Sequence, residues 1–320
     1  MYDVITLGEL LVDFTPAGLS PAGMPLAEQN PGGAVANMIC ALAGFGRQTG
    51  FIGKVGTDMH GKFLRQILEG KGVDTRGLIS DPSVYTTLAF VSLSATGERD
   101  FSFARKPGAD TCLREADLDT RQLKSCRVFH FGSLSLTDEP CRSAHLAAVR
   151  TAKNAGAIIS YDPNYRAPLW PSEEAAIAQM RSVLDLVDVI KISDEETALL
   201  TGKENHEQAA QLLLERGIGC VVVTLGSNGA YAATRHGTAQ LAPPDVPVVD
   251  TTGAGDAFWG GFIHKLLEAG RQPAELQKAD LEDFVCFANC VASLCVEKRG
   301  GIPAMPSLPQ VAEFMAKHGL

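Results

Sequence analysis

Short runs of β-branched and other apolar residues recur along the chain between segments of helical periodicity. Each run predicts a buried strand, because a continuous apolar stretch needs cover on both faces of its sheet. The predicted strands lie at residues 3–7, 126–131, 157–161, 187–192 and 219–225.

Segments in which apolar residues return every three or four positions predict helices between these strands. We place the helices near residues 34–45, 58–70, 139–154, 173–185 and 206–216, and then at 256–269, 280–297 and 307–318. The helix at 139–154 has Thr137 and Asp138 as candidate caps and Gly156 just beyond its end. This alternation predicts an α/β fold with a mostly parallel central sheet flanked by helices on both faces.

Two stretches depart from the alternation and predict a small β-sheet. Residues 10–31 are rich in proline and glycine, whereas residues 84–93 alternate with a period of two and lead through a turn at 95–99 to the run DFSFAR. A hairpin with one apolar face needs cover. We therefore expect a lid, formed by residues 13–31 and 84–106, that closes over a ligand or pairs with a second copy in a homodimer. The core would comprise residues 1–12, 32–83 and 107–320.

The composition argues against several classes of partner. The chain has 320 residues, of which 45% are hydrophobic, and its formal net charge is −9. This acidic balance argues against nucleic acid and anionic membranes as partners. The first residues, MYDVITLGELLVDFTP, lack a basic leader, and no later segment approaches the length of a membrane span. We therefore expect a cytoplasmic protein.

Eight cysteines are scattered along the chain without a Cys-x-x-Cys pair. In a chain of this length without a leader, we interpret them as reduced core thiols. Cys286, Cys290 and Cys295 follow helical spacing, but no histidine lies in step with them. A metal site there is the less favoured interpretation.

The stretch VDTTGAGDAFWGGF at residues 249–262 carries the main candidate chemistry. In a structural interpretation, Gly253 and Gly255 shape a turn and Asp256 caps the following helix. In a chemical interpretation, the amides of Gly253 to Asp256 form an anion site at a helix start, and the carboxylate takes a proton from an attacking hydroxyl. Gly260 and Gly261 each cost the helix about 1 kcal/mol against alanine, which close packing or an approaching ligand would explain.

Other nucleotide-binding motifs fail on inspection. FIGKVG at 51–56 lacks the Ser or Thr that follows the lysine of a phosphate-binding loop, and GFGRQTG at 44–50 has the wrong spacing for a dinucleotide site. A nucleoside triphosphate, if the protein uses one, would therefore bind at a different kind of phosphate-binding site.

Several segments resemble the ribokinase-like (PfkB-type) sugar kinases. DTTGAGDAFWGGF resembles the C-terminal signature of that family, and PGGAVANMICALAGFG at 31–46 resembles its N-terminal signature. Four further segments resemble the fructokinase branch: FSFARKPGAD at 101–110, GSLSLTDEPCRSAHLAA at 132–148, SYDPNYRAPLWPSEEAA at 160–176 and DVIKISDEETALLTG at 188–202. The resemblance covers essentially the whole chain and implies a ribokinase-like fold.

The resemblance also implies a role for each matching residue. Asp256 would be the general base on the acceptor hydroxyl, with Gly253, Ala254 and Gly255 as the anion hole. The residues expected to contact the sugar are Asp13, Gly32, Gly33, Asn37, Phe101, Phe103, Arg105 and Arg166. Those expected to contact the nucleotide are Lys191, Ser193, Glu196, Thr224, Gly226, Asn228, Ala288 and Asn289.

The ligands that the resemblance implies are ATP, Mg²⁺ and K⁺. Glu196 would hold magnesium through water, while Ser193 stands where the family has asparagine. Asp250 and Thr252, with carbonyls near Cys295 and Gly300, match a monovalent-cation site.

Structural interpretations of some of these residues stay open. Asn37 could satisfy backbone groups at the start of its helix, and Arg166 could form a surface ion pair. Phe101 and Phe103, which share a strand face, could only pack the lid. Asp162 and Asn164 belong to an Asp-Pro-Asn sequence and are best explained as turn residues.

The resemblance to fructokinases implies phosphoryl transfer from ATP to fructose, which gives fructose 6-phosphate. A 2-keto-3-deoxygluconate kinase of the same fold is the nearest alternative, and Arg105 and Arg166 could hold the carboxylate of its substrate. Phe103, where such enzymes typically have tyrosine, favours a neutral sugar. A non-catalytic sugar or nucleotide sensor is the alternative from another class, although such a protein should have lost the base or the anion hole.

Overall fold

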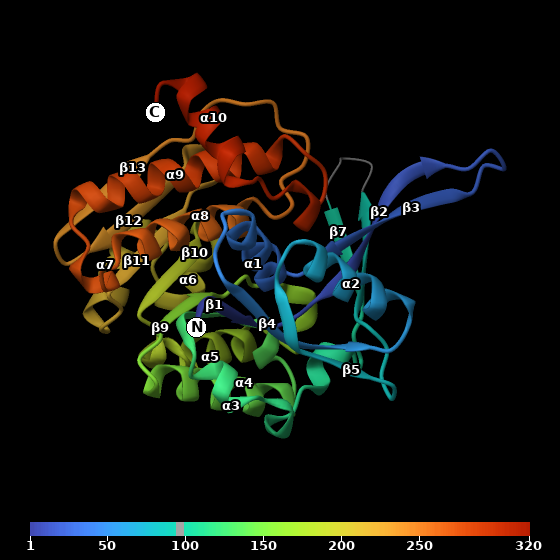
Figure 1. Cartoon of the computed structure of the whole chain (residues 1–320). Coiled ribbons are helices and arrows are strands. Elements are labelled where there is room, and N and C mark those ends of the chain that lie inside the picture. Colours follow the sequence, from blue (N-terminus) through green and yellow to red (C-terminus); the bar gives the residue numbers. More distant parts are fainter. Residues whose placement is uncertain (94–98) are drawn as a thin grey trace.

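The computed structural model describes residues 1–93 and 99–320, and its largest element is a nine-stranded sheet (Figure 1). The strand order is β13-β12-β11-β10-β9-β8-β1-β4-β5. Neighbours from β5 to β11 run parallel, whereas β12 and β13 are antiparallel. The strands are β1 (Tyr2–Leu7), β4 (Thr49–Gly56), β5 (Asp74–Asp81), β8 (Cys126–Gly132), β9 (Ile158–Asp162), β10 (Val189–Ser193), β11 (Cys220–Thr224), β12 (Ala230–Thr234) and β13 (Gly237–Leu241). The predicted α/β class is confirmed.

The five predicted strands are confirmed as β1, β8, β9, β10 and β11, whereas β4, β5, β12 and β13 were not predicted. Strand β4 shows why, because its sequence TGFIGKVG interrupts the apolar run with glycines and Lys54 although every residue in it is buried. A Cβ at Gly53 would lie 2.7 Å from the carbonyl oxygen of Gly8, so glycine is required for the close approach to β1. The Lys54 ammonium pairs with Asp117 at 2.7 Å.

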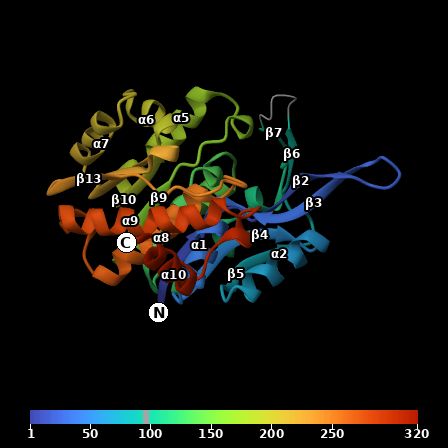
Figure 2. The same ribbon diagram turned by 90° about the horizontal axis from the view of Figure 1, so that it is seen from above.

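Helices cover both faces of the sheet, as Figure 2 shows for α1, α8 and α9 on one side and α5, α6 and α7 on the other. Buried apolar side chains form one cluster on each face. The helices are α1 (Ala34–Gly44), α2 (Met59–Gly70), α3 (Thr120–Leu123), α4 (Cys141–Asn154), α5 (Glu173–Ser182), α6 (Asp194–Thr201), α7 (His206–Glu215), α8 (Ala254–Ala269), α9 (Lys278–Val296) and α10 (Leu308–His318).

The predicted caps of α4 are wrong. The helix begins at Cys141 with Pro140 as its N-cap, and the Thr137 hydroxyl donates instead to the carbonyl oxygen of Leu134 at 3.0 Å. Gly156 has a φ of +90° just beyond the helix, as its position predicted.

The small sheet has the order β3-β2-β6-β7, with β2 (Leu11–Leu19), β3 (Pro25–Gly32), β6 (Leu88–Leu93) and β7 (Arg99–Ala104). The predicted hairpin of β6 and β7 is antiparallel, while its predicted turn at 95–99 lies almost wholly outside the described residues. The β2–β3 hairpin projects from the core, as both ribbon views show (Figures 1 and 2).

Within residues 1–93 and 99–320, the helices are too short or too polar to cross a lipid bilayer. All eight cysteines are free thiols, of which Cys112, Cys126 and Cys286 are partly exposed and the others are buried.

Candidate active site

A cavity of about 550 Å³ lies between the carboxyl edge of the large sheet and the small sheet. Parallel sheets bind their ligands at this edge. The predicted site residues that line it are Asp13, Gly33, Asn37, Phe103, Arg166, Lys191, Asp250, Thr252, Gly253, Gly255 and Asp256. Glu9, Asn30, Asn164 and Arg299 also line it, and the sequence did not single them out as site residues.

The glycine-rich stretch forms the first turn of α8. Gly253 is the N-cap and has a φ of +80°, a left-handed conformation that favours glycine, and a Cβ there would lie 3.1 Å from the Cα of Gly301. The helix begins at Ala254, so Asp256 lies inside the first turn and the interpretation of Asp256 as the cap is wrong. The amide of Ala254 donates to the carbonyl oxygen of Thr251 at 3.2 Å. An anion at this helix start would therefore meet the amides of Gly253, Gly255 and Asp256.

Asp256 accepts a hydrogen bond from Asn37 across the cavity. Nδ2 of Asn37 lies 2.8 Å from Oδ2 of Asp256, which joins α1 to α8 and argues against a purely local role for Asn37 at its helix start. Desolvation in the pocket raises the pKa of Asp256 to about 6, while nearby Lys191 opposes the shift. Asp256 is therefore ionised at neutral pH with a proton affinity that suits a general base.

Two further carboxylates line the cavity. Desolvation raises the pKa of Asp13 to about 6, although Arg166 lowers it, and desolvation raises the pKa of Glu9 to about 7. The Glu9 carboxylate accepts a hydrogen bond from the amide of Ala34 at 2.7 Å and so fixes the first turn of α1. Its position directly after the first predicted strand was the signal that could have identified it.

Lys191, in the middle of β10, and Asp162, the last residue of β9, form a buried ion pair. The Nζ of Lys191 lies 2.5 Å from Oδ2 of Asp162, and both side chains are less than a tenth exposed. The predicted turn role of Asp162 is also present, because its Oδ1 accepts from the amide of Asn164 at 3.2 Å. The turn chemistry was evident from the sequence, whereas the pairing with Lys191 was not.

Glu196 is buried at the start of α6. Its two carboxylate oxygens accept the amides of Tyr165 at 2.7 Å and Ser193 at 2.8 Å. Desolvation raises its pKa, and the nearby charge of Asp162 adds to the rise.

Arg105 does not occupy the place that the resemblance implied. Its guanidinium, with the side chain 3% exposed, donates to Asp110 at 2.7 Å, to Thr137 at 2.9 Å and to the carbonyl oxygen of Leu134 at 2.7 Å. These three bonds tie the end of β7 to the core beneath Leu134, which lines the cavity. Of its neighbours in the sequence, Phe103 lines the cavity, and the side chain of Phe101 lies outside the part that the structure describes.

The other residues predicted to contact the nucleotide differ in exposure. Ser193 and Thr224 pair in register at the ends of β10 and β11, and Gly226 and Asn228 are exposed just beyond. Ala288 is wholly buried, and the side-chain Nδ2 of Asn289 donates to the carbonyl oxygen of Leu241 at 3.0 Å.

Close packing accounts for the two glycines in α8. A Cβ at Gly261 would lie 3.0 Å from the Cα of Ala288 in α9, and one at Gly260 would lie 3.0 Å from the Cβ of Ala41 in α1. These contacts, rather than a ligand, explain why the helix tolerates the cost of glycine.

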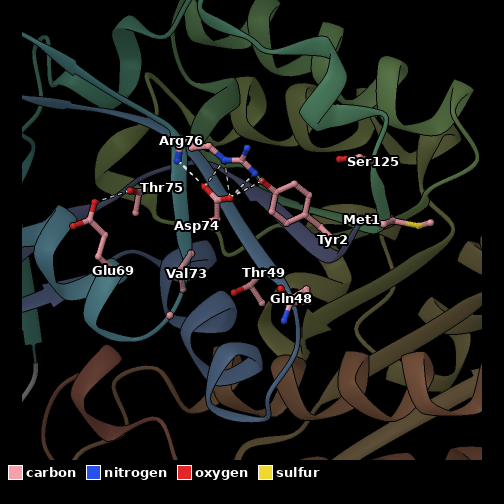
Figure 3. A pocket seen from close by; sticks show the side chains of 11 residues that line it. Met1, Tyr2, Gln48, Thr49, Glu69, Val73, Asp74, Thr75, Arg76 and Ser125 are labelled. Carbon is pink, nitrogen blue, oxygen red and sulfur yellow. Dashed lines mark hydrogen bonds and ion pairs between the residues drawn. The ribbon is translucent and has the colours of Figure 1, made fainter.

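Figure 3 shows a second cavity, of about 570 Å³, at the opposite edge of the sheet. It lies at the amino ends of β1, β4 and β5, and several of its polar side chains pair with one another. The Tyr2 hydroxyl donates to Asp74 at 2.7 Å, and Arg76 pairs with the same carboxylate at 2.7 Å. The predicted site residues that the structure describes lie elsewhere, so we place the candidate site at the carboxyl edge.

Comparison with known proteins shows the family of the chain. The sequence family described as "pfkB family carbohydrate kinase" matches residues 1–308. The chain belongs to this family. It is 42% identical to fructokinase-1 of Oryza sativa subsp. japonica over 98% of the chain and 97% of that relative.

Solved structures of pfkB-type kinases show the same fold. A fructokinase from Xylella fastidiosa with bound ATP has a TM-score of 0.92 at 31% identity, with full coverage of both chains. A double mutant of the fructokinase from Vibrio cholerae O395, bound to fructose, ADP and a potassium ion, has a TM-score of 0.87 at 33% identity over 98% of each chain. The ribokinase-like fold implied by the resemblance is confirmed.

Proposed function

We propose that this protein is an ATP-dependent fructokinase that converts fructose to fructose 6-phosphate. The observation that carries the proposal is the placement of Asp256, which lines the cavity beside the α8 amides and bonds to Asn37. The names of the relatives support the choice of sugar. Because both the carboxylate and the helix start are intact, we favour a catalyst over a sensor.

In the proposed reaction, a hydroxyl oxygen of fructose attacks the γ-phosphorus of ATP. A new O–P bond forms, the bond between that phosphorus and the β–γ bridging oxygen breaks, and ADP leaves with the electron pair. The hydroxyl proton passes to the carboxylate of Asp256, and the amides of Gly253, Gly255 and Asp256 stabilise the charge on the phosphoryl oxygens.

The proposed sugar contacts come from both sheets. Asn37 supports this assignment, because it lines the cavity and its Nδ2 donates to the carboxylate of the proposed base, Asp256. Asp13 and Arg166 offer an acceptor and a donor in the same cavity.

We propose that ATP binds with Mg²⁺, which Glu196 holds through water. Each oxygen of Glu196 accepts one amide and retains a second lone pair for a water molecule, and magnesium prefers this kind of site when phosphates supply its other ligands. When bound, the ion neutralises negative charge on the phosphates.

We propose a potassium site at the loop that precedes α8. Asp250 shapes this loop by accepting the amides of Thr252 at 2.9 Å and Gly300 at 3.0 Å. Its carboxylate charge, together with backbone carbonyls nearby, suits a monovalent cation.

The position of Arg105 favours a neutral sugar over 2-keto-3-deoxygluconate. A substrate carboxylate would need a nearby cation, and Arg105 is already committed to Asp110. Arg166 remains in the cavity, but Lys191 is paired with Asp162, and the carboxylates of Asp13 and Asp256 line the same space with negative charge. A carboxylate on the substrate is therefore disfavoured.

We propose that residues 13–31 and 84–106 act as a lid over the core and that the lid pairs with a second copy. The β2–β3 hairpin exposes Leu19, Met24 and Leu26 by 68%, 63% and 46%. Such apolar exposure favours a partner surface. A strict monomer in light scattering at high concentration would contradict the dimer.

The proposed substrate is tested by comparing fructose, ribose and 2-keto-3-deoxygluconate as acceptors with Mg·ATP and potassium present. We expect kcat/KM to be highest for fructose, with a product that phosphoglucose isomerase accepts as fructose 6-phosphate. A preference for 2-keto-3-deoxygluconate would overturn the choice of a neutral sugar, and no turnover of any acceptor would overturn the kinase.

A further inference from the structure

The ion pair of Lys191 and Asp162 lies directly against the first turn of α8. Lys191 lines the cavity from the middle of β10, and only 6% of the residue is exposed. A Cβ at Gly255 would lie 3.2 Å from the Lys191 Nζ. The glycine thus leaves room for the ammonium beside the amides that would hold an anion.

The surroundings of Lys191 keep it charged. Although desolvation alone would lower its pKa, the carboxylates of Asp162, Glu196 and Asp256 raise it above the usual value of a lysine. A permanent positive charge therefore lies beside the first turn of α8, close enough to Asp256 to interact with its carboxylate.

Stability alone gives little reason for this pair. A buried ion pair loses much of its attraction to desolvation, and apolar side chains of similar volume often serve as well. In this protein the pair has a further property, because its cation faces the cavity while its carboxylate is turned into the strand ends and binds the turn at Asn164.

We propose that Lys191 is a catalytic residue that contacts the phosphoryl group during transfer, and that Asp162 is a positioning residue that holds its ammonium at the helix start. The proposal rests on the function proposed above and deepens it. An ammonium at this point counters the charge of the γ-phosphoryl oxygens, which ADP lacks. Lys191 should therefore discriminate ATP from ADP rather than bind the nucleotide as a whole.

The affinity test compares Lys191→Met with Lys54→Met by calorimetric titration of Mg·ATP and Mg·ADP. Lys54 is a matched control because it is also a buried strand lysine paired with carboxylates, Asp81 and Asp117, and it lies outside the cavity lining. We expect Lys191→Met to weaken ATP binding about tenfold more than ADP binding, while Lys54→Met leaves the ratio unchanged. An equal loss for both nucleotides, or no loss, would overturn the proposal.

Removing Lys191 alone leaves a buried carboxylate unpaired and could unfold the protein. The double variant Lys191→Met/Asp162→Asn avoids this and should show the same loss of ATP preference. The measurement needs no sugar. A wild-type protein that binds ATP more tightly than ADP but phosphorylates no acceptor would therefore contradict the proposed function and still report on Lys191.

The positioning role of Asp162 is tested by the pH dependence of kcat/KM in Asp162→Asn. The acid limb combines the titration of Asp256, whose pKa Asp162 raises, with those of Asp13 and Glu9 in the same cavity. The charged or hydrogen-bonding groups that face Asp256 from the surrounding elements are Lys191, Asp162, Asn37, Arg166 and Asp13. With Lys191 still charged, the limb should move to lower pH, and kcat and the preference for ATP over ADP should both fall because the ammonium is no longer held at the helix start. An acid limb that stays in place would overturn the positioning role, because loosened packing alone predicts no such shift.

Discussion

Replacing Asp256 with asparagine is expected to lower kcat for fructose phosphorylation by at least ~10²-fold. Asparagine keeps the size of the side chain and can accept the hydrogen bond from Asn37, but it cannot take the hydroxyl proton. Stability should not fall, because the raised pKa of Asp256 means that its charge costs folding free energy above about pH 6, and asparagine removes that cost. Steady-state kinetics, urea unfolding at pH 8 and ADP binding would measure these effects.

Glu195→Gln is the matched control for Asp256→Asn, since Glu195 is an exposed carboxylate near the start of α6. We expect its kcat to match that of the wild type. If Asp256→Asn kept most of its activity, or lost folding stability in proportion to activity, a structural role for this carboxylate would be favoured instead.

Replacing Arg105 with methionine is expected to lower the free energy of unfolding by about 3–5 kcal/mol. The substitution would leave Asp110, whose side chain is 3% exposed, buried without its cation, and would remove donors to Thr137 and Leu134. Urea denaturation followed by circular dichroism measures this loss.

Arg166→Met is the comparison for Arg105→Met, because it shows the effect expected when an arginine that contacts the sugar is lost. Arg166 is exposed in the cavity, so its loss should leave the free energy of unfolding within about 0.5 kcal/mol of wild type while raising the KM for fructose. A stable Arg105→Met protein with a raised KM would instead support the sugar contact that the resemblance implied.

The sequence predicted the parts of the fold that depend on local pattern. Strand β10 and helix α8 were evident because each combines a clear periodicity with a sharp boundary. Strand β4 was missed because its glycines permit close approach to β1, a reason that lies in the neighbouring strand and not in the pattern. The caps of α4 were misplaced because Thr137 is engaged by Arg105, a contact across 32 positions.

In the candidate site, too, the local sequence predicted some features, whereas others depend on contacts that only the fold creates. The chemistry of the α8 start followed from VDTTGAGDAFWGGF, but its bond to Asn37 spans 219 positions and only the fold brings the two together. Asp162 was assigned to a turn because the sequence Asp-Pro-Asn is typical of turns. The hydrogen bond of its Oδ2 with Lys191 depends on the pairing of β9 with β10, which the local sequence does not predict. The pairing of Arg105 with Asp110 was not evident either, because a cation that follows a lid strand can face the cavity or the core.

In the proposed reaction, the first turn of α8 holds the transferring phosphoryl group beside Asp256. A crystal structure of the protein with fructose and a non-hydrolysable ATP analogue tests it directly. We predict a fructose hydroxyl within about 3 Å of the Asp256 carboxylate and the terminal phosphate within about 3 Å of the amides of Gly253, Gly255 and Asp256. A nucleotide whose phosphates lie away from α8, or a sugar out of reach of Asp256, would contradict it.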